Sequence, residues 1–495
     1  MDDLISRVAE FIARRRLLRP SDRLVAGVSG GPDSMALLDC LRALGYSVVV
    51  AHLDHGLRPG SWEEAVQVLR RAAERGLPAV AERGDVLARA FPGGNLEEAA
   101  RRTRYEFLAR VALETGARIV VTGHTADDQV ETVLLHLLRG SGTQGLRGML
   151  PDQPLGGIIE VAGASQVRLV RPLLSVWRSE TREFCRRNRT QVTEDPSNQD
   201  FAFWRNRVRG ELIPLLESFN PQVRQAIYRG AQTTAEAHAA LEDLVAEHWA
   251  EVAVQTSDCV LLRLPMLLRL PEAVQRLSLR RSLVALGAGA TSDGFGAVER
   301  LQQLCVQSSP LHAQLGGGLE AWRAGDQVFL VRGPEPHWGF FPQCMPGSAD
   351  RLLPGRKLRL AHGWRLTCEE SGATRKLLAD MRQPRRQDDT AWLDADSLTQ
   401  PLRVRPWAEG DRLLPFGGKG KVKVVDLLAR AHVPPPARRA WPVVTVGQEI
   451  VWVPGVRTSE LCRVTASARR ILHLALLPAK GQPTWRGAPC GLTED

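Results

Sequence analysis

The sequence of 495 residues has few cysteines, and no two of its eight form a C-x-x-C pair. A scattered set of this kind argues against a zinc ribbon, an iron–sulfur cluster and a disulfide framework. It fits a reducing compartment, so we expect a cytoplasmic protein. No apolar run approaches the length of a membrane span, and we therefore expect no membrane association.

The N-terminal stretch lacks the continuous apolar core of a signal peptide. Its apolar residues recur instead with helical spacing, at Leu4, Ile5, Val8, Phe11 and Ile12. This spacing predicts an amphipathic helix at the start of the chain.

The composition is that of an ordinary globular protein, with 44% hydrophobic and 24% charged residues. The length predicts about three domains. The net charge of +10 by itself only hints at a polyanionic partner.

Strand-like and helix-like segments alternate from residue 23 to about residue 175, which predicts a parallel, Rossmann-like sheet with helices on both faces. The expected strands are Leu24–Val28, Ser47–Leu53, Arg118–Thr122 and Val167–Arg171, and the expected helices are Met35–Leu44, Glu63–Arg75, Leu96–Glu114 and Ala126–Arg139.

The strand signal fades after residue 205 and returns near residue 327, which predicts a helical domain followed by an α+β domain. We expect a catalytic domain at 1–205, a helical substrate-binding domain at 206–332, a linker rich in proline and glycine at 333–357, a C-terminal domain at 358–476 and a disordered tail at 477–495.

The stretch Ser-Gly-Gly-Pro-Asp-Ser, Ser29 to Ser34, lies between the first expected strand and the first helix that follows it. Glycines let a backbone turn sharply and approach a ligand, and a helix N-terminus offers unpaired N–H groups to an anion. The stretch therefore predicts a phosphate site. An ordinary turn with a serine helix cap is the alternative that spacing alone leaves open.

This loop contains no lysine, unlike a Walker A loop, in which a lysine reaches the β- and γ-phosphates. It is therefore better suited to holding pyrophosphate as a leaving group than to γ-phosphate hydrolysis. A second glycine motif, Gly140 to Gly145, matches the G-x-G-x-x-G fingerprint but follows an apolar helix instead of a strand. We therefore reject a nicotinamide cofactor.

A second polar cluster follows the third expected strand, at the sheet edge where open α/β proteins bind ligands. Asp128 and Glu131 are three residues apart and share one face of the expected helix. Paired carboxylates can hold an ammonium group or a metal ion, although a well-capped helix start would look the same. On its own, His124 fits a turn or packing histidine.

In this order, the motifs resemble those of the tRNA(Ile)-lysidine synthases, a family of the PP-loop ATP pyrophosphatases. The resemblance rests on the loop Ser29–Ser34 and, further along the chain, on "AHLDHGLR", "NLEEAARRTRYEFL", "GHTADDQVET" with "RGSGTQGLRGM", "RPLL", "EDPSNQDFAFWRNRVR" and the C-terminal "RVRPWAEGDRLLPFGGKGKVKVVD". The loop alone is shared with thiouridine synthetases and GMP synthetase, whereas the ordered set is specific to lysidine synthases.

The resemblance implies a two-step ligation that uses ATP, Mg²⁺, free L-lysine and an isoleucine tRNA with a CAU anticodon. The wobble cytidine is first adenylated at O2, and lysine then displaces AMP at C2. The product, lysidine, gives the tRNA isoleucine identity in place of methionine identity and reading of AUA in place of AUG. The protein is expected to be a monomer or a homodimer.

The resemblance also assigns roles to residues. Catalytic roles fall on Asp33, Arg104, Asp128 and Glu131, with Arg104 as the cation at the α-phosphate, Asp33 as a Mg²⁺ ligand, and Asp128 and Glu131 as the lysine site. ATP contacts fall on Ser29, Gly30, Gly31, Pro32, Asp33, Ser34, Leu53, Gly123 and His124. Contacts to tRNA fall on Arg205, Arg207, Arg403, Arg405, Arg412, Lys419, Lys421 and Lys423.

Three other classes stay open. A related sulfurtransferase would need a catalytic cysteine pair or a cluster near the site, a GMP-synthetase-like enzyme would need a glutaminase module, and a non-catalytic tRNA-binding protein would carry a degenerate loop. One departure from the family is the run "GKGKVKVVD", which replaces a denser lysine run.

Overall fold

The computed structural model describes residues 3–56, 60–86, 96–159, 161–193, 204–256, 258–287, 294–307, 311–333, 338–347, 349–372, 389–465 and 467–479. It divides into two compact units, Met1–Ala240 and Leu241–Asp495. The boundary falls within the long helix α11, Val223–Val252.

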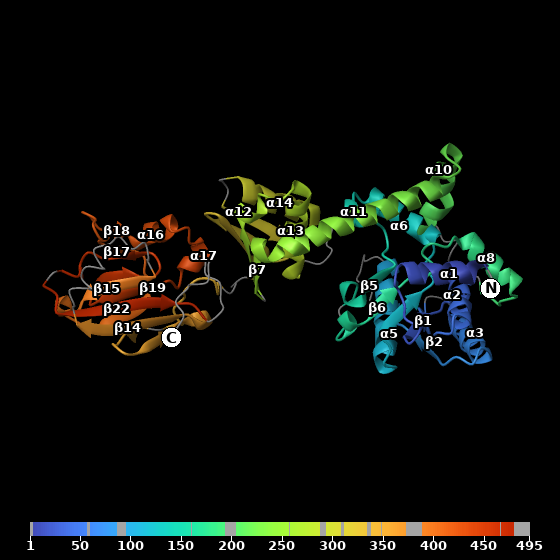
Figure 1. Ribbon diagram of the computed structural model, residues 1–495, viewed down its shortest axis with the longest axis horizontal. Coiled ribbons are helices and arrows are strands. Elements are labelled where there is room, and N and C mark those ends of the chain that lie inside the picture. The colour runs from blue at the N-terminus through green and yellow to red at the C-terminus, as the bar shows by residue number, and fades with distance from the viewer. Residues whose placement is uncertain are drawn as a thin grey trace. The chain divides into compact units, whose positions relative to one another are not determined.

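The first unit is built on a six-stranded sheet in the order β3-β2-β1-β4-β6-β5, parallel except for β5, which pairs antiparallel with β6 (Figure 1). The strands are β1 Arg23–Gly27, β2 Ser47–Asp54, β3 Ala79–Arg83, β4 Ile119–Thr122, β5 Asp152–Pro154 and β6 Arg168–Val170. The four expected strands are confirmed to within two residues. The short edge strands β3 and β5 escaped prediction because neither contains a continuous apolar run.

Apolar residues alternate along the central strands and supply a core on each face of the sheet. Leu24 and Ala26 of β1 pack with the helices α1, α2, α3 and α8, whereas Val25 packs with α5 on the opposite face. The bounds of the helices are α1 Asp3–Arg14, α2 Pro32–Ala43, α3 Ser61–Glu74, α5 Leu96–Glu114, α6 Ala126–Leu138, α7 Thr143–Leu146, α8 Arg178–Arg187, α9 Trp204–Arg207 and α10 Ile213–Phe219, with a π-helical turn at Val208–Leu212. The expected α/β fold with helices on both faces is thereby confirmed.

The strand order reverses direction beside β1. From β1 the chain first adds β2 and β3 on one side and then returns to place β4 on the other. Ligands bind at such a reversal point, beyond the carboxyl ends of the strands. The two connections that meet there are the loop Ser29–Ser34 and the segment Gly123–Thr125.

The second unit begins with a five-stranded antiparallel sheet, in the order β7-β8-β11-β10-β9, packed against helices. Its elements are β7 Ala253–Gln255, β8 Cys259–Arg263, α12 Leu264–Leu267, α13 Glu272–Ala285, α14 Gly294–Val306, β9 His312–Gly316, β10 Leu319–Ala324 and β11 Gln327–Arg332. The expected helices and the strand near residue 327 are present. We expected few strands in this region, and β7, β8, β9 and β10 show that this expectation is wrong. These strands are too short to show a clear alternation of apolar and polar residues.

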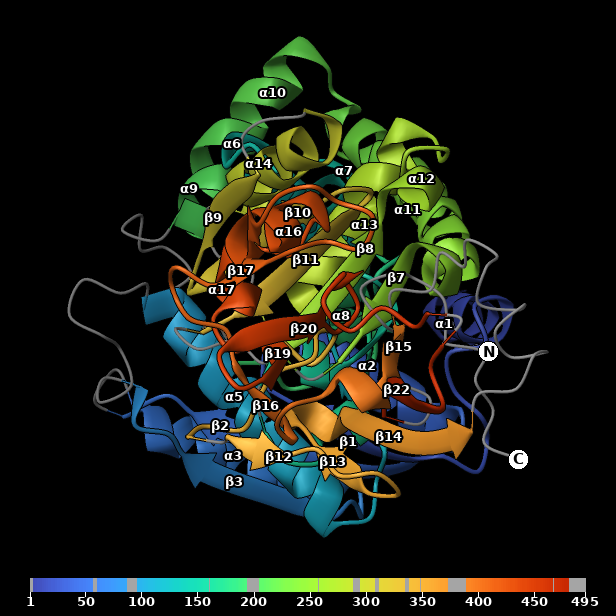
Figure 2. The ribbon, with the colours of Figure 1, turned by 90° about the vertical axis from the view of Figure 1, so that its left-hand side faces the viewer.

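The rest of the second unit is mainly β-structure. One sheet has the order β12-β16-β19-β20-β21 and another β13-β14-β22-β15, and Figure 2 shows β19 beside β20. The bounds are β12 Asp350–Arg351, β13 Lys357–Arg359, β14 Arg365–Gly372, β15 Thr390–Asp394, β16 Leu402–Pro406, β17 Arg412–Leu413, β18 Val422–Lys423, α16 Val424–Arg430, α17 Pro435–Arg438, β19 Pro442–Val446, β20 Glu449–Val453, β21 Arg457–Thr458 and β22 Arg470–Leu477.

Part of the segment expected to be a linker is packed into the core of this unit. Trp338, Phe340, Phe341 and Cys344 are buried in one cluster with Trp441. Residues 338–344 are therefore not a linker. Burial of their aromatic side chains fixes this segment in the core, although the surrounding sequence is rich in proline and glycine. Residues 480–495 of the expected tail lie outside the described residues.

The seven cysteines in the described part of the chain are all buried, and no disulfide joins any two of them. Among the described helices, none is both long and apolar enough to cross a bilayer.

Candidate active site

The loop Ser29–Ser34 turns directly from β1 into α2. Gly30 has a φ of +87°, a conformation that favours glycine, and Gly31 is the residue before the first helical turn. The hydroxyl of Ser34 donates to the carbonyl of Gly31 over 2.9 Å, and the N–H of Gly31 donates to Oγ of Ser29 over 3.4 Å. The loop is thus a compact turn whose end is the N-terminus of a helix, which is the geometry of an anion site.

Gly123, at the end of β4, lies directly against this loop. A Cβ atom at Gly123 would lie 2.9 Å from both the carbonyl carbon and the carbonyl oxygen of Asp33, and 3.0 Å from the nitrogen of Ser34. No side chain fits in that space. The structure therefore brings two of the expected ATP-binding segments into contact at the reversal point of the sheet.

The carboxylate of Asp33 faces helix α8. One oxygen accepts a hydrogen bond from the hydroxyl of Thr181, and the other accepts from Nε of Arg178 over 3.4 Å. Burial raises the pKa of Asp33 above its ordinary value, although Thr181 and Arg178 act in the opposite direction.

Asp128 and Glu131 lie together on α6, as their spacing predicts, and they contact three arginines. Asp128 pairs with Arg178 at 2.9 Å and with Arg205 at 3.0 Å. Glu131, whose side chain is 0% exposed, pairs with Arg205 at 2.8 Å, Arg209 at 2.7 Å and Arg178 at 3.2 Å. The site is therefore a network of alternating charges, with buried carboxylates and partly exposed arginines, in which Arg178 joins the loop to α6.

The arginines keep both carboxylates ionised. Burial would raise the pKa of Asp128 and of Glu131, but the charge of Arg205 and the other guanidinium groups outweighs burial and lowers both pKa values. Asp128 also accepts hydrogen bonds from the N–H of Thr125 over 2.8 Å and from its hydroxyl over 2.9 Å. These bonds cap α6 and fix the carboxylate.

His124 lies among positive charges. Its Nδ1 is 2.8 Å from the hydroxyl of Thr122. Burial, together with Arg171, Arg104 and Arg205, holds the pKa of His124 well below its ordinary value, so the imidazole is neutral at pH 7. The positive charge of Arg104, an expected site residue, is thus one of the charges that lower the pKa of His124.

Comparisons with known proteins show which family the chain belongs to. A model described as "PP-loop domain" matches residues 2–216, and one described as "TilS substrate C-terminal domain" matches residues 402–474. The chain is 32% identical to the tRNA(Ile)-lysidine synthase of Dehalococcoides mccartyi over 482 residues, which cover 95% of this chain and 98% of the relative. It is 34% identical to the enzyme of the same name from Symbiobacterium thermophilum, over 96% of this chain and 98% of the relative.

The chain belongs to the tRNA(Ile)-lysidine synthase family. It is a ligase that uses ATP.

Two arginines of this family member were missed by reasoning from its sequence. Arg178 and Arg209 complete the network around Glu131, yet neither has a spacing that distinguishes it from the many other arginines of the chain. Arg171 was also missed. Its side chain is 1% exposed and donates to the carbonyl of Leu150 over 2.6 Å. Its positive charge lies next to Tyr105.

Other expected site residues lie as follows. Leu53 ends the apolar part of β2 and is buried in the core beneath α5. Asp127, which was not among the expected site residues, accepts from the first N–H of α8 over 2.7 Å and pairs with Arg224 at 2.9 Å. Arg205, which we expect to contact tRNA, forms ion pairs with Asp128 and Glu131.

The remaining basic residues expected to contact tRNA differ in their partners. Arg207 pairs with Glu211, Arg405 with Asp411 and Lys421 with Glu449. The other four, Arg403, Arg412, Lys419 and Lys423, are exposed, and no ion pair with another described residue involves them. An enzyme that binds tRNA phosphates here would have these four cations available without first breaking an ion pair to another described residue.

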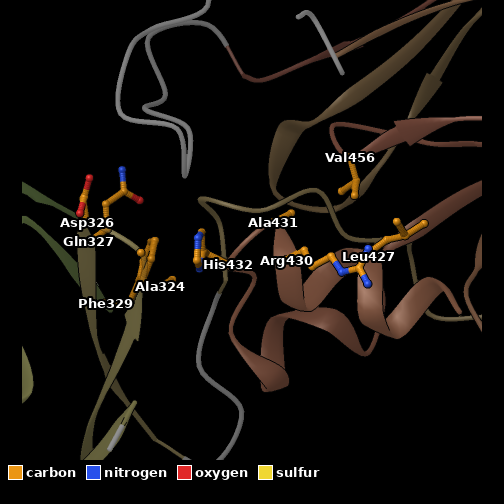
Figure 3. Close-up of a pocket in the computed structure, with 10 residues that line it drawn as sticks. Ala324, Asp326, Gln327, Phe329, Leu427, Arg430, Ala431, His432 and Val456 are labelled. Carbon is orange, nitrogen blue, oxygen red and sulfur yellow. The ribbon is translucent and has the colours of Figure 1, made fainter. Parts of the chain in front are cut away.

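A cavity of about 480 Å³ lies in the second unit, between the β10–β11 turn and α16 (Figure 3). Phe329, Asp326, Arg430 and His432 are among the residues that line it. It shares no residue with the loop Ser29–Ser34 or with α6.

Proposed function

We propose that this enzyme joins lysine to C2 of the wobble cytidine of an isoleucine tRNA with a CAU anticodon. In the first step, O2 of the base attacks the α-phosphate of ATP, an O–P bond forms, and pyrophosphate leaves. In the second step, the lysine amine attacks C2, a C–N bond forms, AMP leaves, and the amine loses a proton. The result is a tRNA that reads AUA as isoleucine.

The observation that carries the proposal is the contact between the lysine-free loop and Gly123 at the reversal point of the sheet. The loop offers backbone groups and two serine hydroxyls to phosphate, and the absent lysine leaves pyrophosphate free to depart. The close approach of Gly123 holds the loop beside α6, so a nucleotide bound there lies next to the acidic pair.

Mg²⁺ would be bound mainly by the phosphates of ATP. The described residues contain no group of three His, Cys, Asp or Glu side chains that could hold a metal ion. Mg²⁺ commonly binds through one carboxylate and substrate phosphates, and Asp33 at the start of α2 fits that role. When bound, the ion neutralises phosphate charge, while Arg104 supplies a further cation for the α-phosphate.

The carboxylates of Asp128 and Glu131 are our candidates for binding the ammonium group of lysine. They already neutralise Arg178, Arg205 and Arg209, so a lysine ammonium has to replace a guanidinium group. ATP brings several negative charges beside the loop. Those charges would attract an arginine away from Glu131, and lysine would then take its place. The order of binding follows from this charge balance: ATP first, then lysine.

The exposed cations Arg403, Arg412, Lys419 and Lys423 suit contact with the tRNA backbone. We expect such contacts to orient the tRNA and the loop of the first unit to carry the chemistry.

Sulfur transfer is the second class to be tested. It would require a reactive thiolate, and Cys185 is the cysteine nearest to the loop, since its thiol donates to the carbonyl of Pro32 over 3.4 Å. Burial and the charges of Asp39 and Asp33 raise the pKa of this thiol to about 12. A thiol held in its neutral form is a poor nucleophile, which favours ligation.

The test is incubation of the purified protein with a transcript of the CAU-anticodon isoleucine tRNA, ATP and radiolabelled lysine, followed by nucleoside analysis. We expect one labelled nucleoside, with AMP and pyrophosphate formed in equal amounts. The variant Asp33→Ala serves as the inactive control. Absence of label with a verified transcript would refute the proposal, and a thiolation assay on the same transcript would follow.

A further inference from the structure

A second feature of the chain that suits RNA is an exposed aromatic ring in a basic loop. Phe416 is 46% exposed and lies between β17 and β18, the two short strands near α16 in the second unit (Figure 1). The same loop carries Lys419, and Arg412 and Lys423 lie on the strands that flank it. The ring is thus an exposed aromatic group surrounded by positive charges, the combination found on surfaces that bind RNA.

Hydrogen bonds hold the backbone on both sides of the ring. The N–H of Phe416 donates to the carbonyl of Thr458 over 3.0 Å, and Arg457 donates to the carbonyl of Phe416 over 3.2 Å. The N–H of Gly417 donates to the carboxylate of Glu460 over 2.8 Å. The ring is therefore presented from a fixed backbone, which reduces the entropy lost on binding.

A guanidinium group lies over one face of the ring and leaves the two exposed planar groups together. The central carbon of Arg463 lies 5.2 Å from the ring centroid of Phe416, and Glu460 holds Arg463 at 3.1 Å. Both side chains are exposed. An aromatic ring together with an arginine plane is the surface on which unpaired bases stack in complexes with RNA.

The charge around the ring distinguishes it from a similar pair elsewhere. Phe295, 71% exposed, also has an arginine over its ring, Arg276 at 5.3 Å. There, however, Arg276 pairs with Glu299 at 2.5 Å and with Glu272 at 3.7 Å, so the surroundings are acidic. At Phe416 one glutamate pairs with the arginine, but Arg412, Lys419 and Lys423 lie in the same loop or on the strands that flank it, so Phe295 provides a control with a different charge environment.

We propose that Phe416 and Arg463 form a stacking surface for an unpaired nucleobase of the RNA substrate. The proposal rests on the function proposed above, because it assumes that tRNA is the substrate. It adds a contact of a different kind: stacking depends on the π-face of a base, whereas the neighbouring lysines and arginines recognise phosphate charge.

The test is the equilibrium binding of the isoleucine tRNA transcript to the full-length protein at several salt concentrations. Loss of a stacked base weakens binding about ten- to a hundredfold. We expect a loss of this size for Phe416→Leu, little change for Phe416→Trp, which preserves the stacking surface, and none for Phe295→Leu. The slope of log affinity against log salt should be the same for Phe416→Leu and wild type, because no phosphate contact is lost.

The outcomes separate this proposal from the proposed function. Wild-type protein that fails to bind the transcript at any salt concentration would overturn the proposed function, and the stacking surface with it. Binding by wild type with equal affinity for Phe416→Leu would overturn the stacking surface alone. Two other results would show that Phe416 serves the local fold, and either would overturn the stacking proposal. One is an equal loss of tRNA affinity in Phe416→Leu and Phe416→Trp. The other is a thermal unfolding midpoint that falls together with the affinity.

Discussion

Replacing Gly123 by alanine adds one methyl group at the contact between the end of β4 and the pyrophosphate loop. That methyl would lie 2.9 Å from the carbonyl carbon and oxygen of Asp33, whereas ordinary contact begins near 3.4 Å. The two backbones must therefore separate by about 0.5 Å. Because the opposing atoms are backbone, no change of rotamer can relieve the overlap.

The magnitude follows from that displacement. Overpacking of a tight contact costs about 1–3 kcal/mol of folding free energy. A misplacement of about 1 Å at a reacting centre costs roughly a hundredfold in rate, so about half of that shift should cost roughly tenfold. We therefore expect Gly123→Ala to fold, to bind tRNA like wild type and to release pyrophosphate about tenfold more slowly or worse.

The assay is pyrophosphate release at saturating ATP and tRNA, with thermal unfolding and tRNA binding measured on the same preparations. Gly157→Ala is the matched control, because a Cβ at Gly157 meets nothing within 4 Å. A folded Gly123→Ala protein that releases pyrophosphate at the wild-type rate would show that the close approach of the two segments has no part in the chemistry.

Three further predictions concern other parts of the chain. Glu131→Gln should raise the lysine concentration for half-maximal turnover about ten- to a hundredfold, because it weakens a charge-assisted contact, while adenylation of the tRNA persists; a block of adenylation itself would assign Glu131 to ATP or Mg²⁺. Because the pKa values of Asp128 and Glu131 are lower in the folded protein, the ionised carboxylates stabilise the fold. This stabilisation is fully present above their ordinary pKa values, near 4, and is lost as pH falls through the lower pKa values of the folded protein. Denaturant unfolding between pH 3 and pH 6 should thus show a smaller loss at acid pH for Glu131→Gln than for wild type, and equal losses would contradict this account. The double variant with Lys419→Ala and Lys423→Ala should reduce the salt slope of tRNA binding by about 1.4–1.8, and an unchanged slope would remove both lysines from the phosphate contacts.

The chemistry of the loop could be inferred from local sequence. A strand with four apolar residues, a loop with two glycines and a helix start are all encoded within Leu24 to Leu41, and backbone sterics restrict what such a stretch can form. Four strands and four helices before residue 175 were predicted to within three residues for the same reason, because each of these segments carries its own period, whereas β3 and β5 were missed. The spacing that puts Asp128 and Glu131 on one helix face is equally local.

The partners of those residues depend on tertiary structure. Arg178, Arg205 and Arg209 reach Glu131 from 47, 74 and 78 positions along the chain. Nothing in their own neighbourhoods marks them among the chain's arginines. The short strands β7 to β10 also depend on tertiary structure, and so does the burial of residues 338–344. Packing with distant segments stabilises both, and local sequence preference does not.

The sequence by itself determined that this protein has a lysine-free phosphate loop, a parallel sheet to carry it and an acidic helix face at the same edge, because these features depend on neighbours within a few positions. Only the tertiary structure decided that Gly123 presses against the Asp33–Ser34 peptide and that the acidic pair is neutralised by three arginines. Those contacts follow from how the chain packs around the end of β1, where van der Waals exclusion and the cost of an unpaired buried charge select one arrangement.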